Sequence, residues 1–173
     1  RNLLNLKHVQ EASGAKVILA LKGFAMHGVF PLVKQYLAGT TASSLNEAIL
    51  GKEEFGSEVH VYSPVYLNNE FTPLLDIAKH VTFNSISQWE KHKEQLLNHP
   101  NKISAGLRIN PEHSVVDTAL YDPCIPGTRL GVTSKKIGSK LPDGIEGHAG
   151  PLAGVLAGMD WAAGQGIGAI VTA

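Results

Sequence analysis

A lysine at the end of an apolar segment is the first residue whose type and position predict chemistry. Five apolar residues at 17–21 lead directly into Lys22, and Gly23 follows. A continuous apolar run this short is typical of a fully buried strand in a parallel sheet. An amine at the end of such a strand is costly unless it is paired, reaches water or is used covalently. Partial desolvation favours the neutral amine, which can form an imine with an aldehyde. The alternative is a strand-end lysine that simply reaches solvent.

The elements that must position Lys22 alternate between strand and helix patterns. Two capping boxes, beginning at Ser44 and Ser87, are expected to start helices, and Gly39 is expected to cap an earlier one. The remaining patterns predict helices at 3–11, 30–37, 73–80 and 88–98, and strands at 17–21, 40–42, 59–62, 81–83, 103–109, around Ile145 and at 167–172. This alternation, without hairpin signals, predicts a parallel α/β sheet. An open doubly wound sheet and a barrel fit it equally well.

The bulk properties are those of one soluble globular domain. The chain has 173 residues, of which 43% are hydrophobic and 17% charged, and its formal net charge is zero. This balance indicates neither a nucleic-acid nor a membrane partner, and the apolar runs are too short to span a bilayer. The lone Cys124 excludes an internal disulfide and suits a reducing cytoplasm. The histidines show no zinc-ligand spacing, so we expect no metal site and interpret them as surface or packed residues.

Six motifs in order carry a resemblance to a known family. Ala-Leu-Lys-Gly-Phe-Ala at 20–25 resembles the cofactor-lysine strand of the alanine-racemase-like barrel decarboxylases, the fold type III pyridoxal-phosphate enzymes. The others resemble one branch, the carboxynorspermidine (carboxyspermidine) decarboxylases: Gly-Thr-Thr-Ala-Ser-Ser at 39–44, Val-His-Val-Tyr-Ser-Pro at 59–64, Phe-Asn-Ser at 83–85, Gly-Leu-Arg-Ile-Asn-Pro at 106–111 and Pro-Cys-Ile-Pro-Gly-Thr-Arg-Leu-Gly-Val at 123–132. Their order and spacing suit this family from Asn5 to Glu146.

The resemblance implies a (β/α)8 TIM barrel, of which this chain holds a part, with the family's C-terminal β-domain absent from it. A complete barrel needs about 250 residues, so we expect residues 1–173 to be a cofactor-binding barrel domain cut at both ends. The tail at 148–173 departs from the family pattern. The family also implies a cytoplasmic homodimer whose sites borrow residues from the partner. We therefore expect the 173-residue chain alone to be poorly soluble and inactive.

The resemblance also assigns roles to particular residues. Lys22 would bind the aldehyde of pyridoxal 5′-phosphate, and Arg108 would lie near the cofactor or else form a salt bridge. Arg129 would be a basic residue beside the lysine strand or a helix-capping loop residue. His148 would stack on the cofactor ring, while the backbone amides of Gly164, Gly166 and Gly168 would cradle its phosphate, with a flexible linker as the alternative. Polar residues at strand ends would add contacts beyond their capping roles: Thr41, Ser43, Ser44, Asn84 and Ser85.

The implied activity is decarboxylation of carboxynorspermidine or carboxyspermidine to norspermidine or spermidine and carbon dioxide in polyamine synthesis. The substrate amine would displace Lys22, and the cofactor ring would take up the electrons left by carbon dioxide. Two alternatives stay open. One is another decarboxylase of this fold type, acting on diaminopimelate, ornithine or arginine. The other is a barrel that carries the cofactor without turnover.

Overall fold

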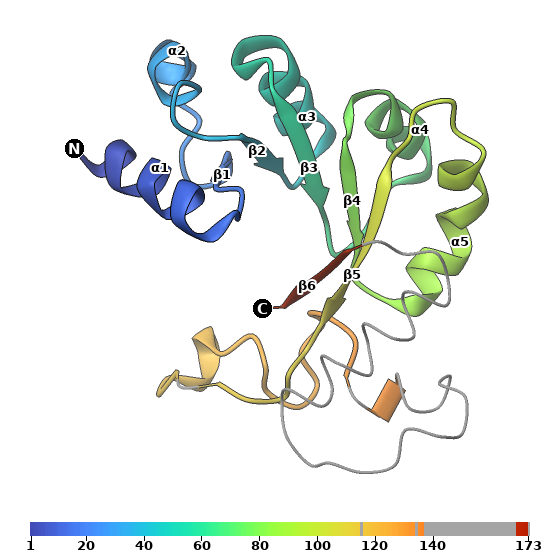
Figure 1. Cartoon of the computed structure of the whole chain (residues 1–173). Helices are drawn as coiled ribbons and strands as arrows, with labels where there is room; N and C mark the ends of the chain where they lie inside the picture. Colours follow the sequence, from blue (N-terminus) through green and yellow to red (C-terminus); the bar gives the residue numbers. More distant parts are fainter. Residues whose placement is uncertain (115, 134, 137–168, 173) are drawn as a thin grey trace. The chain divides into compact units, whose positions relative to one another are not determined.

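Strands and helices alternate along the chain, as the sequence predicts (Figure 1). The structure, a computed structural model, describes residues 1–114, 116–133, 135–136 and 169–172, with backbone alone for the last segment. The chain divides into two compact units. The first contains residues 1–63, 67–81 and 99–103, and the second contains residues 64–66, 82–98 and 104–173. Each unit is described separately below.

The first unit is a layer of parallel strands with helices packed on it. Its elements in chain order are α1 (Asn2–Ser13), β1 (Ile18–Ala20), the 3-10 turn η1 (His27–Val29), α2 (Phe30–Val33), β2 (Gly39–Ala42), α3 (Leu45–Leu50), the π-helical turn η2 (Gly51–Phe55), β3 (Glu58–Tyr62) and α4 (Asn68–Ile77). β4 (His80–Phe83) begins in this unit and ends in the second. Figure 1 shows α3 lying against β2 and β3. This is the βαβ arrangement that a parallel sheet requires.

Strand register in the first unit is fixed by parallel pairing of β1 with β2 and of β2 with β3. Ala20, Thr41 and His60 stand side by side across the three strands. Gly39, expected to cap a helix, instead lies within β2 opposite Glu58. A Cβ at this position would overlap the carbonyl oxygen of Glu58, so the glycine permits close approach of two strands.

The core beneath this sheet is built by aromatic and aliphatic side chains. Phe30 and Phe55 are fully buried and meet edge to face, with ring centroids 5.5 Å apart. Leu21, Val33 and Leu37 complete the cluster. Burying side chains of this size contributes about 1.5 to 3 kcal/mol each. The apolar residue that precedes Lys22 therefore belongs to the core, whereas Lys22 itself does not.

The prediction that residues 17–21 form a fully buried strand is wrong in part. β1 is only three residues long, and Ile18 and Leu19 are half-buried while Ala20 is exposed. Within its unit β1 pairs with one strand, β2, so the backbone groups on its other edge form no strand-to-strand hydrogen bonds among the described residues of that unit. A strand paired on one side has fewer neighbours to cover it than a central strand. Leu21, just after the strand, is the one fully buried residue of the run.

Helix α1 is held by a polar contact and carries no buried residue. The expected apolar stripe is largely exposed, since Leu4 and Val9 are 59% and 52% exposed. Of these apolar residues, Leu3 packs, partly buried, against the core cluster, and Gln10 adds two hydrogen bonds. Its Nε2 donates to the carbonyl oxygen of Tyr36 at 2.7 Å, and its Oε1 accepts from the backbone N–H of Val17 at 2.7 Å.

Serine residues start α3 and the helix that follows β4, in two turns built alike. Ser44 caps α3 by accepting from the N–H of Glu47, so the first predicted capping box is confirmed. The second box is wrong by two residues, because Ser85 rather than Ser87 is the cap and accepts from the N–H of Gln88. In both turns the third helical side chain reaches back to the N–H of the residue before the cap, at 2.6 Å.

The second unit contains the end of β4, α5 (Ile86–Leu97), β5 (Ser104–Ile109), the 3-10 turn η3 (Ala119–Tyr121) and β6 (Ala169–Thr172), which pairs parallel with β5. Tyr66 and Trp89 both pack edge-on against Phe83, with centroids 5.9 and 5.3 Å away. The Tyr66 hydroxyl donates to the carbonyl oxygen of Thr82 at 2.7 Å. This aromatic group fixes α5 against β4.

Element boundaries differ from expectation at α2, which ends at Val33 rather than at Leu37, and most of all at α4. The pattern predicts a helix at 73–80, but α4 begins at Asn68 and contains Pro73 in its sixth position. Proline lacks the N–H that the helix interior uses, which is why it suggests a start rather than a continuation. The predicted strand around Ile145 lies outside the described residues.

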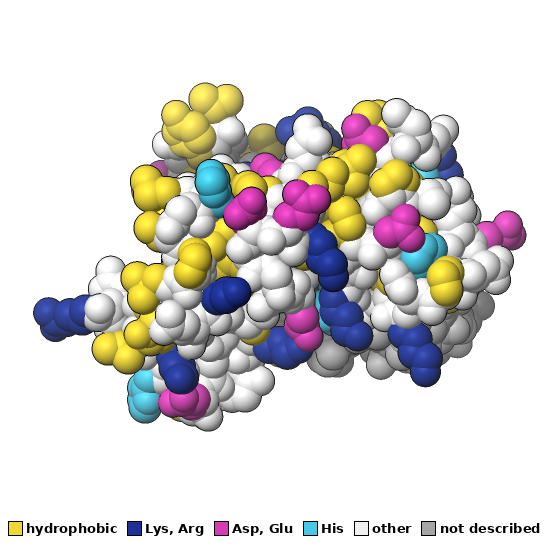
Figure 2. Space-filling model, turned by 90° about the horizontal axis from the view of Figure 1, so that it is seen from above, with side chains coloured by type: hydrophobic (Ala, Val, Ile, Leu, Met, Phe, Trp, Pro, Cys, Tyr) yellow, Lys and Arg dark blue, Asp and Glu magenta, His cyan; other side chains and the backbone are white. Residues whose placement is uncertain are grey.

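The surface shows no field of one charge sign on the face seen in Figure 2, where basic and acidic side chains are interspersed with hydrophobic ones. This mixture agrees with the formal net charge of zero. Within the part of the chain that the structure describes, none of the helices has the length and apolar character needed to cross a bilayer.

Candidate functional site

Lys22 lies just beyond β1, two residues past Ala20, in the turn that follows the strand. The turn is closed by the N–H groups of Gly23 and Phe24, which both donate to the carbonyl oxygen of Ala20. Leu21 stays in the core while the Lys22 side chain is exposed. The expected burial of the amine is therefore not seen in the described residues. The amine is instead accessible, at the C-terminal end of a parallel strand, where α/β folds bind ligands.

The residues in register with Ala20 increase in size across the sheet. Ala20 is in register with Thr41 of β2, which is itself in register with His60 of β3. An alanine and a threonine fill little of the space above their strands. β1 and β2 therefore carry little side-chain bulk at this register, and His60 of β3 carries the first large ring.

Arg108 is the penultimate residue of β5 in the second unit, and its side chain is half-buried. The backbone beside it is crossed by the loop at 129–132. The N–H of Val132 donates to the carbonyl oxygen of Arg108 at 2.9 Å. The N–H of Asn110 donates to the carbonyl oxygen of Val132, also at 2.9 Å. Gly131 has φ +79°, and a Cβ there would come within 2.9 Å of the Asn110 nitrogen. Only glycine therefore allows the loop to pass so close to β5.

Asn84 holds the same loop from the end of β4. Its side chain is 8% exposed, with Nδ2 donating to the carbonyl oxygen of Arg129 and Oδ1 accepting from the N–H of Gly131, both at 2.8 Å. The structure thus brings together Arg108, Asn84 and the backbone around Arg129, three positions that the sequence singles out. The Arg129 side chain is exposed. Its loop also lines a surface hollow of about 340 Å³ formed by residues 120–123 and 125–130.

The other strand-end polar residues are used in the structure itself. Ser44 and Ser85 are helix caps, and Ser43 donates its hydroxyl proton to Glu47 at 2.9 Å. Thr41 lies half-buried on β2. Cys124 is a buried free thiol whose backbone N–H donates to Asp122, as expected for a structural cysteine. The predicted cofactor residues of the tail lie outside the described residues: His148, Gly164, Gly166 and Gly168.

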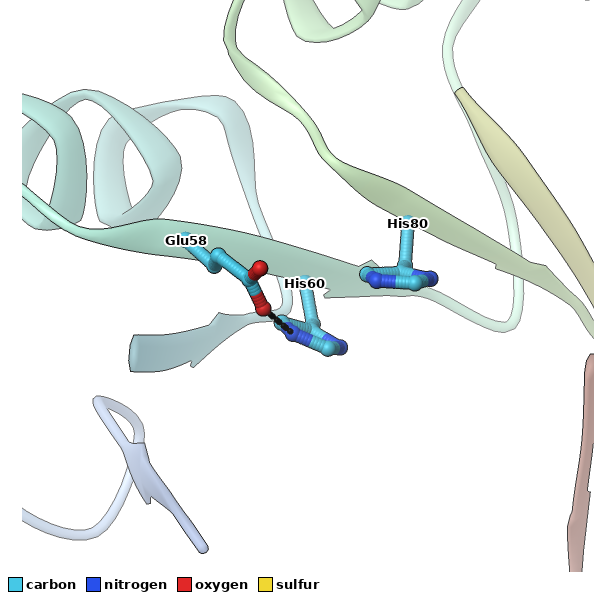
Figure 3. A group of neighbouring side chains, drawn as sticks. All are labelled: Glu58, His60 and His80. Atoms are coloured by element: carbon cyan, nitrogen blue, oxygen red, sulfur yellow. Dashed lines mark ion pairs between the residues drawn. The ribbon is translucent and has the colours of Figure 1, made fainter. Parts of the chain in front are cut away.

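A cluster that the sequence does not reveal lies on β3 and β4. Figure 3 shows Glu58 and His60 on one face of β3 with the ring of His80 beside that of His60. The two rings stack with centroids 4.2 Å apart, and candidate ligand atoms of all three residues lie within 4.8 Å of one another. His80 is twenty positions beyond His60 and comes beside it through parallel pairing of β3 and β4. In the sequence, only the two-residue spacing of Glu58 and His60 within one predicted strand indicates that any two of these side chains share a face.

The charges of this cluster are set by burial and by Lys16. The Lys16 ammonium donates to both Glu58 carboxylate oxygens at 2.8 Å and holds the pKa of Glu58 below its usual value. Desolvation by burial lowers the pKa of His60 and of His80, in both cases against a smaller opposing effect of Glu58. Both rings are therefore neutral at pH 7, and Glu58 is ionised.

The comparisons with known proteins agree with this fold. No protein-family model matches the chain. It is 48% identical over 147 residues to carboxyaminopropylagmatine decarboxylase of Synechocystis, and 40% identical over 147 residues to carboxynorspermidine/carboxyspermidine decarboxylase of Campylobacter jejuni. It is 44% identical over 131 residues to the corresponding protein of Herminiimonas arsenicoxydans. These matches cover 76% to 85% of this chain, which spans only 35% to 38% of the length of these relatives.

The structural match is to a crystal structure of carboxynorspermidine decarboxylase from Campylobacter jejuni complexed with norspermidine. The TM-score is 0.67 at 25% sequence identity, covering 99% of this chain and 55% of that one. The fold and the relatives together define the class: the chain is a barrel segment homologous to decarboxylases. More particularly, it is a homologue of the carboxynorspermidine/carboxyspermidine decarboxylases, and both the resemblance and the fold class predicted from the motifs are confirmed.

Proposed function

We propose that this chain is part of a pyridoxal-phosphate-dependent decarboxylase that acts on a carboxylated polyamine in polyamine synthesis. The observation that carries the proposal is 40% to 48% identity, over most of the chain, to proteins named as decarboxylases of such compounds. These names favour this reading over the diaminopimelate, ornithine and arginine alternatives. The chain spans little more than a third of these relatives, so the activity proposed is that of the whole protein.

The described residues fit the aldehyde end of the cofactor. Pyridoxal phosphate, when bound, supplies an electron sink for the carbanion that loss of carbon dioxide leaves. Lys22 would hold the cofactor because its amine is accessible just beyond the C-terminal end of β1, where the paired residues Ala20 and Thr41 are small. Arg108 would contribute a positive charge at the end of β5, where the 129–132 loop fixes its backbone. The proposed roles of His148, Gly164, Gly166 and Gly168 concern residues outside the described part.

The remaining parts of the proposal concern the whole protein. Residues 1–173 would belong to one cofactor-binding barrel domain of a cytoplasmic homodimer. Support for a polyamine ligand comes from the related crystal structure, which is complexed with norspermidine. Both carboxynorspermidine and carboxyaminopropylagmatine would present an α-amino acid group to the cofactor and an extended cationic chain to the rest of the site. The shared amino acid group is what decarboxylation requires.

Turnover measurements with and without Lys22 test the proposal. The protein, supplied with pyridoxal phosphate, is assayed for carbon dioxide release from carboxynorspermidine, carboxyspermidine and carboxyaminopropylagmatine. We expect turnover of at least one of them, and nearly complete loss in Lys22→Ala. Lys52→Ala is the matched control, since Lys52 is an exposed lysine of the same unit and should leave turnover unchanged. Cofactor binding without turnover of any of the three would favour the non-catalytic alternative.

A further inference from the structure

Three side chains able to bind a metal ion meet on the neighbouring strands β3 and β4. Glu58 and His60 share a face of β3 because they are two residues apart. The N–H of Lys79 donates to the carbonyl oxygen of Val59 at 2.8 Å, which places His80 opposite His60. The ligand atoms of Glu58, His60 and His80 all lie within 4.8 Å of one another (Figure 3). All three residues belong to the first unit.

The donor set selects a particular class of ion. Two imidazole nitrogens and one carboxylate oxygen suit zinc and related transition metals, whereas magnesium and calcium prefer oxygen ligands alone. Two histidines and one acidic residue are also a known ligand set for zinc with one position left for water. The strands that carry these residues are paired in a sheet, so the ligands are held on a rigid support.

A ring nitrogen in the cluster has unused capacity to bind. Nε2 of His60 is buried and makes no hydrogen bond within the described residues, and the nearby Glu58 oxygen Oε2 is 3.5 Å away. That distance is too long for a normal hydrogen bond. A buried nitrogen without a partner is costly, and a metal ion would remove the cost.

Lys16 opposes a cation but does not exclude it. Its ammonium is 2.8 Å from both oxygens of Glu58, and the lysine side chain is 58% exposed. An ionised carboxylate has about four lone-pair positions, so Glu58 can accept from Lys16 and still face His60. An exposed lysine can also swing into water at little cost, because surface ion pairs contribute about 0 to 1 kcal/mol. Lys16 should therefore weaken metal binding rather than prevent it.

Binding requires a modest change in the rings. Stacked imidazoles 4.2 Å apart, with planes 20° apart, cannot both aim in-plane lone pairs at one ion. Rotation about the Cβ–Cγ bond turns a ring edge towards the ion, and this torsion is broad for histidine. Donor atoms around tetrahedral zinc are about 3.3 Å apart, given bond lengths of about 2.0 to 2.1 Å. The ligand atoms of Glu58, His60 and His80 are at most 4.8 Å apart here. The most distant pair would therefore have to approach by about 1.5 Å to bind one zinc ion.

We propose that Glu58, His60 and His80 form a binding site for one zinc ion that joins β3 to β4. Glu58 and His80 are the first residues of their strands, whereas His60 is in the middle of β3, in register through Thr41 with Ala20 of β1. The ion would act as a clip between neighbouring strands. Neither decarboxylation nor pyridoxal phosphate is needed for it to bind.

The test is a calorimetric titration of the chelator-treated protein with zinc chloride at pH 7.5. We expect one ion per chain, and a loss of affinity of about a hundredfold or more in His60→Ala, His80→Ala and Glu58→Gln, since even second-shell partners contribute about 10- to 100-fold. His8→Ala and His113→Ala are matched controls, because both histidines are exposed and lie outside the cluster. Lys16→Met should strengthen binding by removing the competing charge.

Two further measurements keep the test decisive if a variant folds poorly. Zinc should raise the melting temperature of the parent protein, and cobalt should give the intense visible absorption of a four-coordinate site that zinc then abolishes. His80→Gln keeps the side-chain volume and should lose both signals. Three results would each overturn the proposal: no zinc binding by the parent, equal affinity in the cluster variants, or an equal loss in the His8 and His113 controls, which would indicate adventitious surface binding.

Discussion

Replacing Asn84 by alanine should release the loop at 129–132 from the end of β4. The side chain is 8% exposed and makes two hydrogen bonds of 2.8 Å, one to the Arg129 carbonyl oxygen and one from the Gly131 N–H. Asn84→Ala removes both bonds and leaves two peptide groups without partners, at about 1 to 3 kcal/mol for each. The surroundings are part-buried, so water recovers some of the loss. We expect a decrease of about 2 to 4 kcal/mol in the free energy of unfolding.

Urea denaturation of the parent and variant proteins measures this difference. Asn101→Ala is a matched control, because the Asn101 amide donates to two backbone oxygens at 3.4 Å, near the limit of a hydrogen bond. It should cost less than about 1 kcal/mol. Asn84→Asp should not rescue stability, since it keeps an acceptor for Gly131 but sets a carboxylate against the Arg129 carbonyl. If Asn84→Ala cost no more than Asn101→Ala, the two short bonds would not be what holds the loop.

Four further predictions concern single residues. Borohydride reduction of the cofactor-loaded protein and peptide mapping should place the label on Lys22, and label on another lysine would contradict its assigned role. Arg108→Ala should impair cofactor binding or turnover more than stability, whereas a large fall in melting temperature with unchanged kinetics would make it a structural residue. Gly39→Ala should destabilise by at least about 2 kcal/mol in urea denaturation because its Cβ meets the neighbouring strand, and a neutral effect would refute that packing. His92 is 2% exposed, and burial lowers its pKa below the usual 6.5. Because the unfolded chain then binds protons more readily, stability should be complete above pH 6.5 and decrease as pH falls below it, and His92→Gln should flatten this pH profile.

The sequence predicts the order and type of the elements well, because their signals are local. Ser44 and Glu47 have the spacing of a capping box, and the structure forms one there. The second helix start was misplaced because Ser85 and Ser87 each precede a suitable residue three positions later, and the end of β4 decides between them. The start of α4 is predicted at Pro73 because proline favours the first turn of a helix. In the structure the helix continues through Pro73, with Phe71 and Leu74 packed in the core.

The site was less predictable because its geometry depends on contacts between distant segments. The residue type and position of Lys22 make it a candidate, but the number of strands beside β1 determines how exposed it is. Asn84 was expected to act as a cap, whereas its side chain binds a loop 45 residues away. The pairing of β3 with β4 brings His80 beside His60, and no spacing rule within a single segment indicates that.

The polar attachment of α1 has a consequence for how the protein opens. Gln10 supplies both hydrogen bonds that fasten this helix, while Leu4 and Val9 stay in water. Little apolar surface is lost when the helix detaches, so its separation requires far less free energy than unfolding of the unit. The amide protons of α1 should therefore exchange with solvent deuterium through local opening, well before those of β2 and β3, and the rate should respond to Gln10→Ala but hardly to denaturant.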